Sequence, residues 1–88
     1  MIEYRIFKYE ADENGTYFVP DAAATVLLVA QRGASVFPFI WCKINVHAEM
    51  GFRQFQCVGT GHKVERGSVI VGSAVCGAYV WHVVEVTP

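Results

Sequence analysis

The sequence is poor in charge and has no long apolar run. Charged residues make up 17% of its 88 residues, and the formal net charge is −1. Binding to long nucleic acid needs many Lys and Arg side chains, and this chain has no basic block. No stretch reaches the ~18 apolar residues of a membrane span, and the first residues lack a signal-peptide pattern. We therefore expect a cytoplasmic protein whose partners include neither long nucleic acid nor a membrane.

Cysteine and histidine are also scarce, with three residues of each type. Structural zinc needs four converging ligands, and no C-x-x-C or H-x-x-x-H pair is present. Cys42, Cys57 and Cys76 each fall in a different strand-like run, so we expect buried free thiols. The sequence therefore predicts no metal, no disulfide and no cofactor.

The apolar content is high for so short a chain. Hydrophobic residues make up 53% of the sequence. A single domain of this length, here residues 1–88, buries only about 60% of the surface of its unfolded chain. The surplus apolar surface favours a homo-oligomer, a dimer or a tetramer.

Short runs of β-branched, aromatic and alternating residues recur along the whole chain, separated by turn residues. They predict an all-β fold, a small antiparallel β-sandwich or barrel of about seven short strands. The predicted strands are Ile2–Tyr9, Thr16–Val19, Ala24–Gln31, Ser35–Val46, Phe52–Gly59, Ser68–Cys76 and Ala78–Thr87.

Residues 21–31 allow two interpretations. Asp21 is a suitable cap for a short helix that would carry the alanines after it. However, Thr25–Val29 is rich in β-branched residues, and Pro20 ends the preceding strand. We predict a bend at Pro20–Ala23 followed by a buried strand over Ala24–Gln31, and the short helix remains the alternative.

The first motif of interest is Gly59-Thr60-Gly61-His62, at the end of an apolar strand. Glycines let a backbone approach a ligand closely, and consecutive N–H groups can hold an anion. Thr60 and His62 would add side-chain donors, and Arg66 a nearby positive charge. The alternative is a strand that ends in a glycine bulge.

The second candidate surface is the alternating run Phe37-x-Phe39-x-Trp41-x-Lys43. Aromatic rings on one face of a strand can stack a nucleotide base, and Lys43 can neutralise its phosphate. The alternative is a core or subunit interface, the usual place for aromatic residues in small domains. The run from Ser35 to Val46 is apolar on both faces, which indicates a central or interface strand.

A catalytic set is not evident. Cys76, His82 and Glu85 have the residue types of a nucleophilic triad. His82 and Glu85 are three residues apart on one strand, so their side chains face opposite sides. We therefore expect a protein that is not an enzyme.

The C-terminal strand contains Tyr79-Val80-Trp81-His82 followed by Glu85. Together with Gly59-Thr60-Gly61-His62 and a strand that contains Trp41, it resembles a family of phage-encoded proteins of unknown function with G-T-G-H and F-V-W-H-x-x-E motifs. Tyr79 replaces the usual phenylalanine, and Lys63 stands where proline commonly comes after the first motif. The resemblance implies a phage or prophage protein that acts in the bacterial host cytosol.

Small phage proteins of this kind include oligomeric sponges that hold the cyclic nucleotide signals of bacterial immunity without cleaving them, and this analogy implies an anti-defence role. The alternatives are a protein-interaction module that inhibits a host protein through an exposed β edge, or a minor virion or assembly protein. The residues expected to bind the nucleotide are Trp41, Lys43, Arg53, Gly59, Thr60, Gly61, His62, Arg66, Tyr79 and Trp81.

Overall fold

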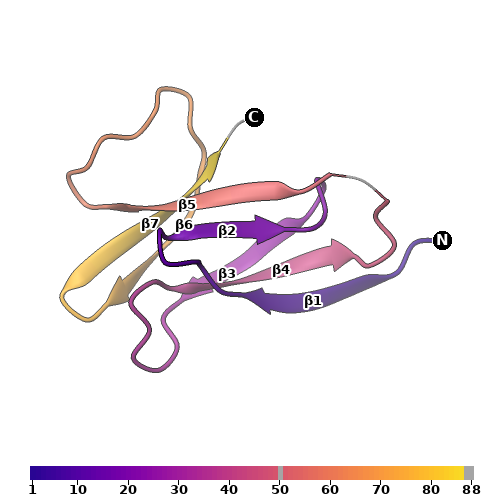
Figure 1. Ribbon diagram of the computed structural model, residues 1–88, viewed down its shortest axis with the longest axis horizontal. Helices are drawn as coiled ribbons and strands as arrows, with labels where there is room; N and C mark the ends of the chain where they lie inside the picture. Colours follow the sequence, from indigo (N-terminus) through magenta and orange to yellow (C-terminus); the bar gives the residue numbers. More distant parts are fainter. Residues whose placement is uncertain (50, 87–88) are drawn as a thin grey trace.

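Two antiparallel β-sheets form the fold, as the sequence predicts (Figure 1). The computed structural model describes residues 1–49 and 51–86. Sheet A has the strand order β1-β4-β3 and sheet B the order β2-β5-β7-β6. The described residues include no helix that could cross a membrane. The strands are β1 (Tyr4–Tyr9), β2 (Thr16–Val19), β3 (Thr25–Ala30), β4 (Phe39–Asn45), β5 (Arg53–Gly59), β6 (Ile70–Cys76) and β7 (Tyr79–Val86).

The predicted strand over Ala24–Gln31 forms, but the prediction that it is buried is wrong. Strand β3 lies at the edge of sheet A, and Leu27 and Leu28 are 50% and 52% exposed. A register shift between Val26 and Leu28 leaves only part of the strand facing the core. A run of apolar residues therefore predicts the strand but not the burial. The helical alternative is also wrong, because residues 22–23 form a turn, as the predicted bend requires, and Thr25–Ala30 form a strand.

The long predicted strand Ser35–Val46 is shorter in the structure, where β4 begins at Phe39. Pro38 precedes it, has no backbone N–H to donate and is fully buried. Strand β4 is central in sheet A, as its two apolar faces indicate. Thr87, the predicted end of the last strand, lies outside the described residues.

The core lies between the two sheets and is built from alternate residues of their strands. Two of the three cysteines, Cys42 and Cys57, belong to this cluster, and all three thiols are free and buried. Burial raises the pKa of Cys42 and of Cys57 to about 11 each. The thiols therefore stay protonated and pack as small apolar groups. The cluster consists of Tyr17, Val19, Ala24, Ile40, Cys42, Ile44, Phe55, Cys57 and Val83.

Tyr17 on β2 joins the two sheets through its hydroxyl group. The Tyr17 hydroxyl donates its hydrogen to the carbonyl of Pro38, because a carbonyl can only accept. The Tyr17 oxygen can therefore accept a hydrogen bond from the Cys57 thiol, 3.1 Å away. The side chain is completely buried, and this burial is the main reason that its pKa is raised. Each buried polar group at this point therefore has a partner.

Asp21 ties the bend after β2 to the end of β4. Its carboxylate accepts hydrogen bonds from the backbone N–H of Asn45 and of Ala23, both at 2.8 Å. Asp21 is 6% exposed. These two hydrogen bonds lower the pKa of Asp21, and the bond from Asn45 contributes most. Burial opposes this shift.

We expect Tyr17→Phe to lower the free energy of unfolding by about 1–3 kcal/mol, because the Pro38 carbonyl would be buried without a donor. For a domain of this size each kcal/mol corresponds to a fall of about 4–8 °C in melting temperature. Tyr79→Phe is the matched control, since Tyr79 is 64% exposed. Equal melting temperatures for the two variants would contradict the role given to the Tyr17 hydroxyl.

A second prediction concerns pH. The folded pKa of Asp21 lies below its unfolded value, so its stabilisation is present above about pH 4 and is lost as the pH falls through the folded pKa. Asp21→Asn should therefore lower the melting temperature at pH 7, and the difference from the unchanged protein should shrink at about pH 2–3. The exposed carboxylate Glu13 supplies the control Glu13→Gln. A difference that is independent of pH would refute the assignment.

Candidate functional site

The two C-terminal motifs lie side by side on sheet B. Gly59 on β5 is opposite Trp81 on β7, and Val58 is opposite His82. Residues that are distant in the sequence are thus neighbours through strand pairing. We call the four residues Gly59, Thr60, Trp81 and His82 the motif junction.

On the outer side of sheet B, His82 joins the motif junction to strand β6. Its Nε2 lies 2.9 Å from the hydroxyl of Thr60, and its Nδ1 lies 2.7 Å from the hydroxyl of Ser73. A neutral imidazole has one donor and one acceptor nitrogen, so it can bond both hydroxyls at once. The Thr60 hydroxyl also lies 3.4 Å from the Val80 carbonyl. The three side chains thus bond one another across neighbouring strands.

On the inner side of sheet B, aromatic rings gather over Gly59. A β-carbon on Gly59 would lie 3.4 Å from the ring of His62 and 3.7 Å from that of Trp81. The ring of Trp81 packs against Phe37 at 4.9 Å between centroids and stacks on Tyr79 at 5.8 Å. Trp81, Tyr79 and Phe37 therefore close one end of the sandwich.

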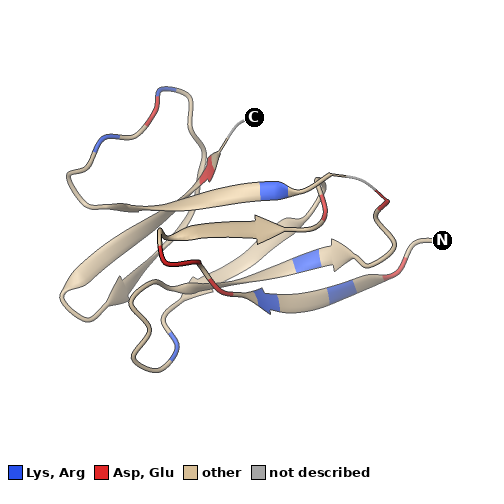
Figure 2. Ribbon diagram, in the orientation of Figure 1, with Lys and Arg blue, Asp and Glu red and all other residues tan. Residues whose placement is uncertain are grey.

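The Gly59–His62 segment is a tight turn. The N–H of His62 donates to the carbonyl of Gly59 at 3.1 Å, and Gly61 has a positive φ of 87°. This angle favours glycine, as expected for this motif. The hydroxyl of Thr60, one of the expected phosphate donors, is hydrogen-bonded to His82, and the backbone N–H of His62 donates to the carbonyl of Gly59. Beyond the turn, the loop between β5 and β6 carries positive and negative residues, Arg66 among them (Figure 2).

Arg53 lies at the opposite end of β5 from this turn. Its guanidinium donates two hydrogen bonds of 2.7 Å to the Glu85 carboxylate and a third to the carbonyl of Ala24 in the bend before β3. This pairing, chiefly the hydrogen bonds, lowers the pKa of Glu85 and raises that of Arg53. The bidentate ion pair closes this end of the sandwich, and its charge is compensated. Glu85 therefore faces the inside, opposite to His82, as the sequence indicates.

Trp41 and Lys43 lie on the outer face of sheet A. They point outward together with Phe39, because the residues between them on β4 are buried. The ring centroids of Phe39 and Trp41 are 6.4 Å apart. Two lysines flank these rings, with Lys8 Nζ 5.0 Å from the Phe39 centroid and Lys43 Nζ 5.0 Å from that of Tyr4. We call this set of five residues the lysine-aromatic face.

The residues predicted to bind a nucleotide therefore occupy separate places in one chain. Trp41 and Lys43 share the lysine-aromatic face, whereas Arg53 belongs to an ion pair at one end of the sandwich. The others lie at the motif junction, next to it on β7, or on the loop after β5: Gly59, Thr60, Gly61, His62, Arg66, Tyr79 and Trp81. A single copy does not bring the ten residues into one pocket.

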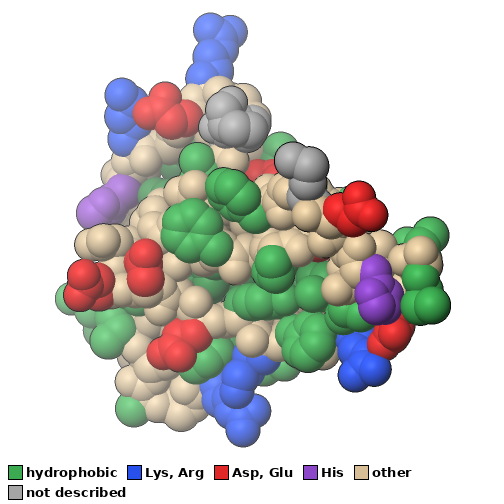
Figure 3. Space-filling model, turned by 45° about the vertical axis from the view of Figure 1, so that its right-hand side comes forward, with side chains coloured by type: hydrophobic (Ala, Val, Ile, Leu, Met, Phe, Trp, Pro, Cys, Tyr) green, Lys and Arg blue, Asp and Glu red, His purple; other side chains and the backbone are tan. Residues whose placement is uncertain are grey.

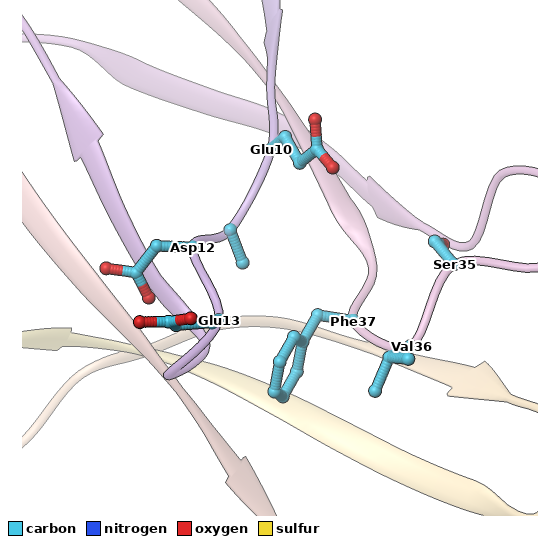
Figure 4. A pocket seen from close by; sticks show the side chains of 7 residues that line it. Glu10, Asp12, Glu13, Ser35, Val36 and Phe37 are labelled. Carbon is cyan, nitrogen blue, oxygen red and sulfur yellow. The ribbon is translucent and has the colours of Figure 1, made fainter.

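The largest cavity lies between the β1–β2 turn and the β3–β4 loop, and it is acidic. It has a volume of about 500 Å³ and is lined by Glu10, Asp12, Glu13 and Phe37, among others. In Figure 4, Asp12 and Glu13 lie on one side of the Phe37 ring, and Val36 and Ser35 lie on the other. Carboxylates repel a phosphate, so this cavity does not fit the anionic ligand expected from the sequence.

A second cavity, of about 270 Å³, lies between the β5–β6 loop and the outer face of sheet B. Its lining includes Val58 and Val84 from the sheet and Lys63 and Glu65 from the loop. The loop shields Val84, which is 5% exposed although it points away from the core. The cavity thus reflects how the loop covers part of this sheet.

Sequence reasoning missed three residues of these surfaces. Ser73 lies next to His82 only because β6 pairs with β7. Lys8 and Tyr4 lie beside the aromatic row only because β1 pairs with β4. The alternation of β1 indicates that Tyr4 and Lys8 share a face, but the partner strand carries no local signal.

Within residues 1–49 and 51–86, no group of three or more His, Cys, Asp or Glu side chains is placed to hold a metal ion. Comparisons with curated proteins and with solved structures find no match. Comparison with protein families finds one match, which extends from residue 2 to residue 88. Over this range the chain belongs to the family described as a domain of unknown function, DUF7352.

Proposed function

We propose that this protein is a non-catalytic binding protein that sequesters a nucleotide on the lysine-aromatic face. The observation that carries the proposal is the row of Phe39 and Trp41 on the central strand of sheet A, with Lys8 and Lys43 beside it. Every base has an aromatic face that can stack on a ring, and the phosphate needs only a few positive charges.

The charge distribution supports this location over the others. Arg53 is neutralised by Glu85, and the largest cavity is lined by carboxylates. The lysine-aromatic face holds two positive groups on neighbouring strands, Lys8 on β1 and Lys43 on β4, and each ammonium lies over an aromatic ring. Figure 2 shows positive residues on both of these strands. An anion that approaches this face gains from both charges.

The face is open, so a second copy is needed to enclose a ligand. Tyr4, Ile6 and Leu28 on sheet A are 59%, 60% and 52% exposed. Hydrophobic side chains are also exposed between the charged groups elsewhere on the surface (Figure 3). Covering this apolar surface would favour association, and a binding site between copies would enclose the nucleotide. We therefore propose a homo-oligomeric sponge.

The resemblance to phage-encoded proteins supplies the ligand class to test first. A phage accessory protein that opposes bacterial immunity would hold a cyclic nucleotide and leave it intact. The protein should therefore release an unaltered ligand when it is denatured.

A protein-interaction module that inhibits a host protein is the second candidate. Strand β1 favours it, because an exposed edge strand can add a strand from another protein. Such a module would bind no nucleotide, which separates the two functions in one experiment.

Titration calorimetry with a panel of cyclic mono- and dinucleotides tests the proposal. Trp41→Ala should weaken binding by about tenfold or more, as expected for one lost base stack. Lys43→Gln should weaken binding and reduce its dependence on salt, because one phosphate contact is lost. Trp41→Phe should retain part of the affinity, since it keeps a ring at this position.

Two further variants decide between the lysine-aromatic face and the loop. Thr60→Ala and His62→Ala should leave nucleotide affinity unchanged if the ligand lies on sheet A. Loss of binding in these two variants with full binding in Trp41→Ala would transfer the site to the motif junction. Absence of binding to every nucleotide of the panel would reject the proposed function.

A further inference from the structure

Strand β1 is an exposed edge of sheet A. Among the described residues it pairs only with β4, and Figure 1 shows it with no strand on its other side. Five of its six residues are exposed, including Tyr4, Ile6 and Phe7 at 59%, 60% and 42%. An exposed edge strand with apolar side chains at these positions can pair with another strand.

The backbone of β1 presents free hydrogen-bonding groups at regular intervals. The Val46 N–H donates to the Glu3 carbonyl, so the pair Glu3–Val46 is hydrogen-bonded. Backbone groups alternate in direction along an antiparallel strand. The N–H and carbonyl groups of Tyr4, Ile6 and Lys8 therefore point away from β4, and no described segment pairs with that side.

A second copy of β1 fits this edge in one favourable antiparallel register. In this register Ile6 lies opposite Ile6 of the second copy. Tyr4 then lies opposite Lys8 of the second copy, and Lys8 lies opposite Tyr4 of the second copy. These are the residues whose backbone groups are free, so the pairing completes hydrogen bonds at each of them. The cross-strand pairs are then aliphatic with aliphatic and ring with ammonium, and no like charges stand directly opposite each other.

Neighbouring charges agree with this register. Arg5 would stand opposite Phe7 of the second copy, and it already forms an ion pair of 2.5 Å with Glu3. A register shifted by one residue would place the free backbone groups opposite occupied ones. The strand is therefore self-complementary about Ile6.

We propose that two copies of this chain associate through antiparallel pairing of β1 about Ile6, which joins the two A sheets into one continuous sheet. In this dimer the two lysine-aromatic faces lie on the same side of the joined sheet. What the dimer does for ligand binding rests on the proposed function. Lys8 of the second copy comes opposite Tyr4, whose ring already lies under Lys43.

The pairing makes the partner part of the ligand site. Lys43 of one copy and Lys8 of the second would both lie beside the Tyr4 ring. Two ammonium groups this close repel each other, and an anion between them relieves the repulsion. A nucleotide phosphate placed there would contact both copies, with Trp41 available for the base. Nucleotide binding should therefore strengthen the dimer.

The substitution Ile6→Lys tests the interface, because it places two lysines opposite each other at the two-fold axis. The exposed side chain of Ile6 makes this change tolerable for folding of a single copy. Val75→Lys is the matched control, since Val75 is 63% exposed on β6 in the other sheet. Light scattering should give the mass of a dimer for the unchanged protein and for Val75→Lys, and the mass of a monomer for Ile6→Lys.

Cross-linking provides an independent measurement. In a hydrogen-bonded antiparallel pair the Cα atoms are about 5.5 Å apart, a separation that a disulfide spans. Ile6→Cys should therefore form a covalent dimer on mild oxidation, and Val75→Cys should not. The native cysteines are buried and do not compete.

The outcomes separate this interface from the proposed function. A monomeric unchanged protein, or a dimer that survives Ile6→Lys, would overturn the β1 interface even if nucleotide binds. A dimer lost in Ile6→Lys together with absence of nucleotide binding would support the interface and reject the sponge. If both proposals hold, Ile6→Lys should lose the dimer and weaken nucleotide binding together.

Discussion

The buried hydroxyl of Tyr17 constrains the whole sandwich. It belongs to β2 in sheet B, yet it donates to the carbonyl of Pro38 at the entry to β4 in sheet A. Its oxygen also meets the Cys57 thiol of β5. An unpaired phenol at this depth would be costly, so the two sheets must keep the separation that satisfies it. This bond fixes where β4 begins and hence which of its residues face outward.

The outer faces of the two sheets differ in cover and in polarity. The outer face of sheet B is partly covered by the β5–β6 loop and carries the hydrogen-bonded group of Thr60, Ser73 and His82. The outer face of sheet A has no such cover within the described residues and exposes rings, aliphatic side chains and two lysines. The side chains of Thr60, Ser73 and His82 on sheet B satisfy one another, whereas sheet A exposes rings and lysines that can stack on a ligand and attract its charge. This contrast is the physical basis for placing a binding surface on sheet A.

Close approach and charge pairing shape the rest of the molecule. A β-carbon at Gly72 of β6 would lie 2.9 Å from Cβ of Val29 in β3, so glycine lets the two sheets meet at this point. At the end of β5, Arg53 serves both layers at once, because it binds Glu85 of sheet B and the Ala24 carbonyl next to β3. The positive charge of Arg53 is thus compensated within the fold, which the sequence alone does not indicate. The same chain leaves Lys8 and Lys43 on the surface, where their charge can act on a ligand.

Local sequence patterns were enough to locate the strands and to define the outward face of β4. Runs of β-branched, aromatic and alternating residues identified the seven strands of the described structure. Alternation also grouped Phe39, Trp41 and Lys43 on one side of β4, because residues two apart on a strand share a face. It also separated His82 from Glu85 for the same reason. Pro20 marked the end of β2, and the glycines of the Gly59–His62 motif marked the turn that contains Gly61.

Which strands are neighbours, and which faces are covered, became evident only in three dimensions. The partners Ser73 for His82, Glu85 for Arg53 and Lys8 for the aromatic row all come from pairing between distant segments. The apolar run of β3 is an exposed edge, because in the described part of the chain sheet A has three strands and β3 is the last of them. Alternation records which residues share a face but holds no information on the strand that lies opposite, since long-range pairing depends on how the whole chain buries its core.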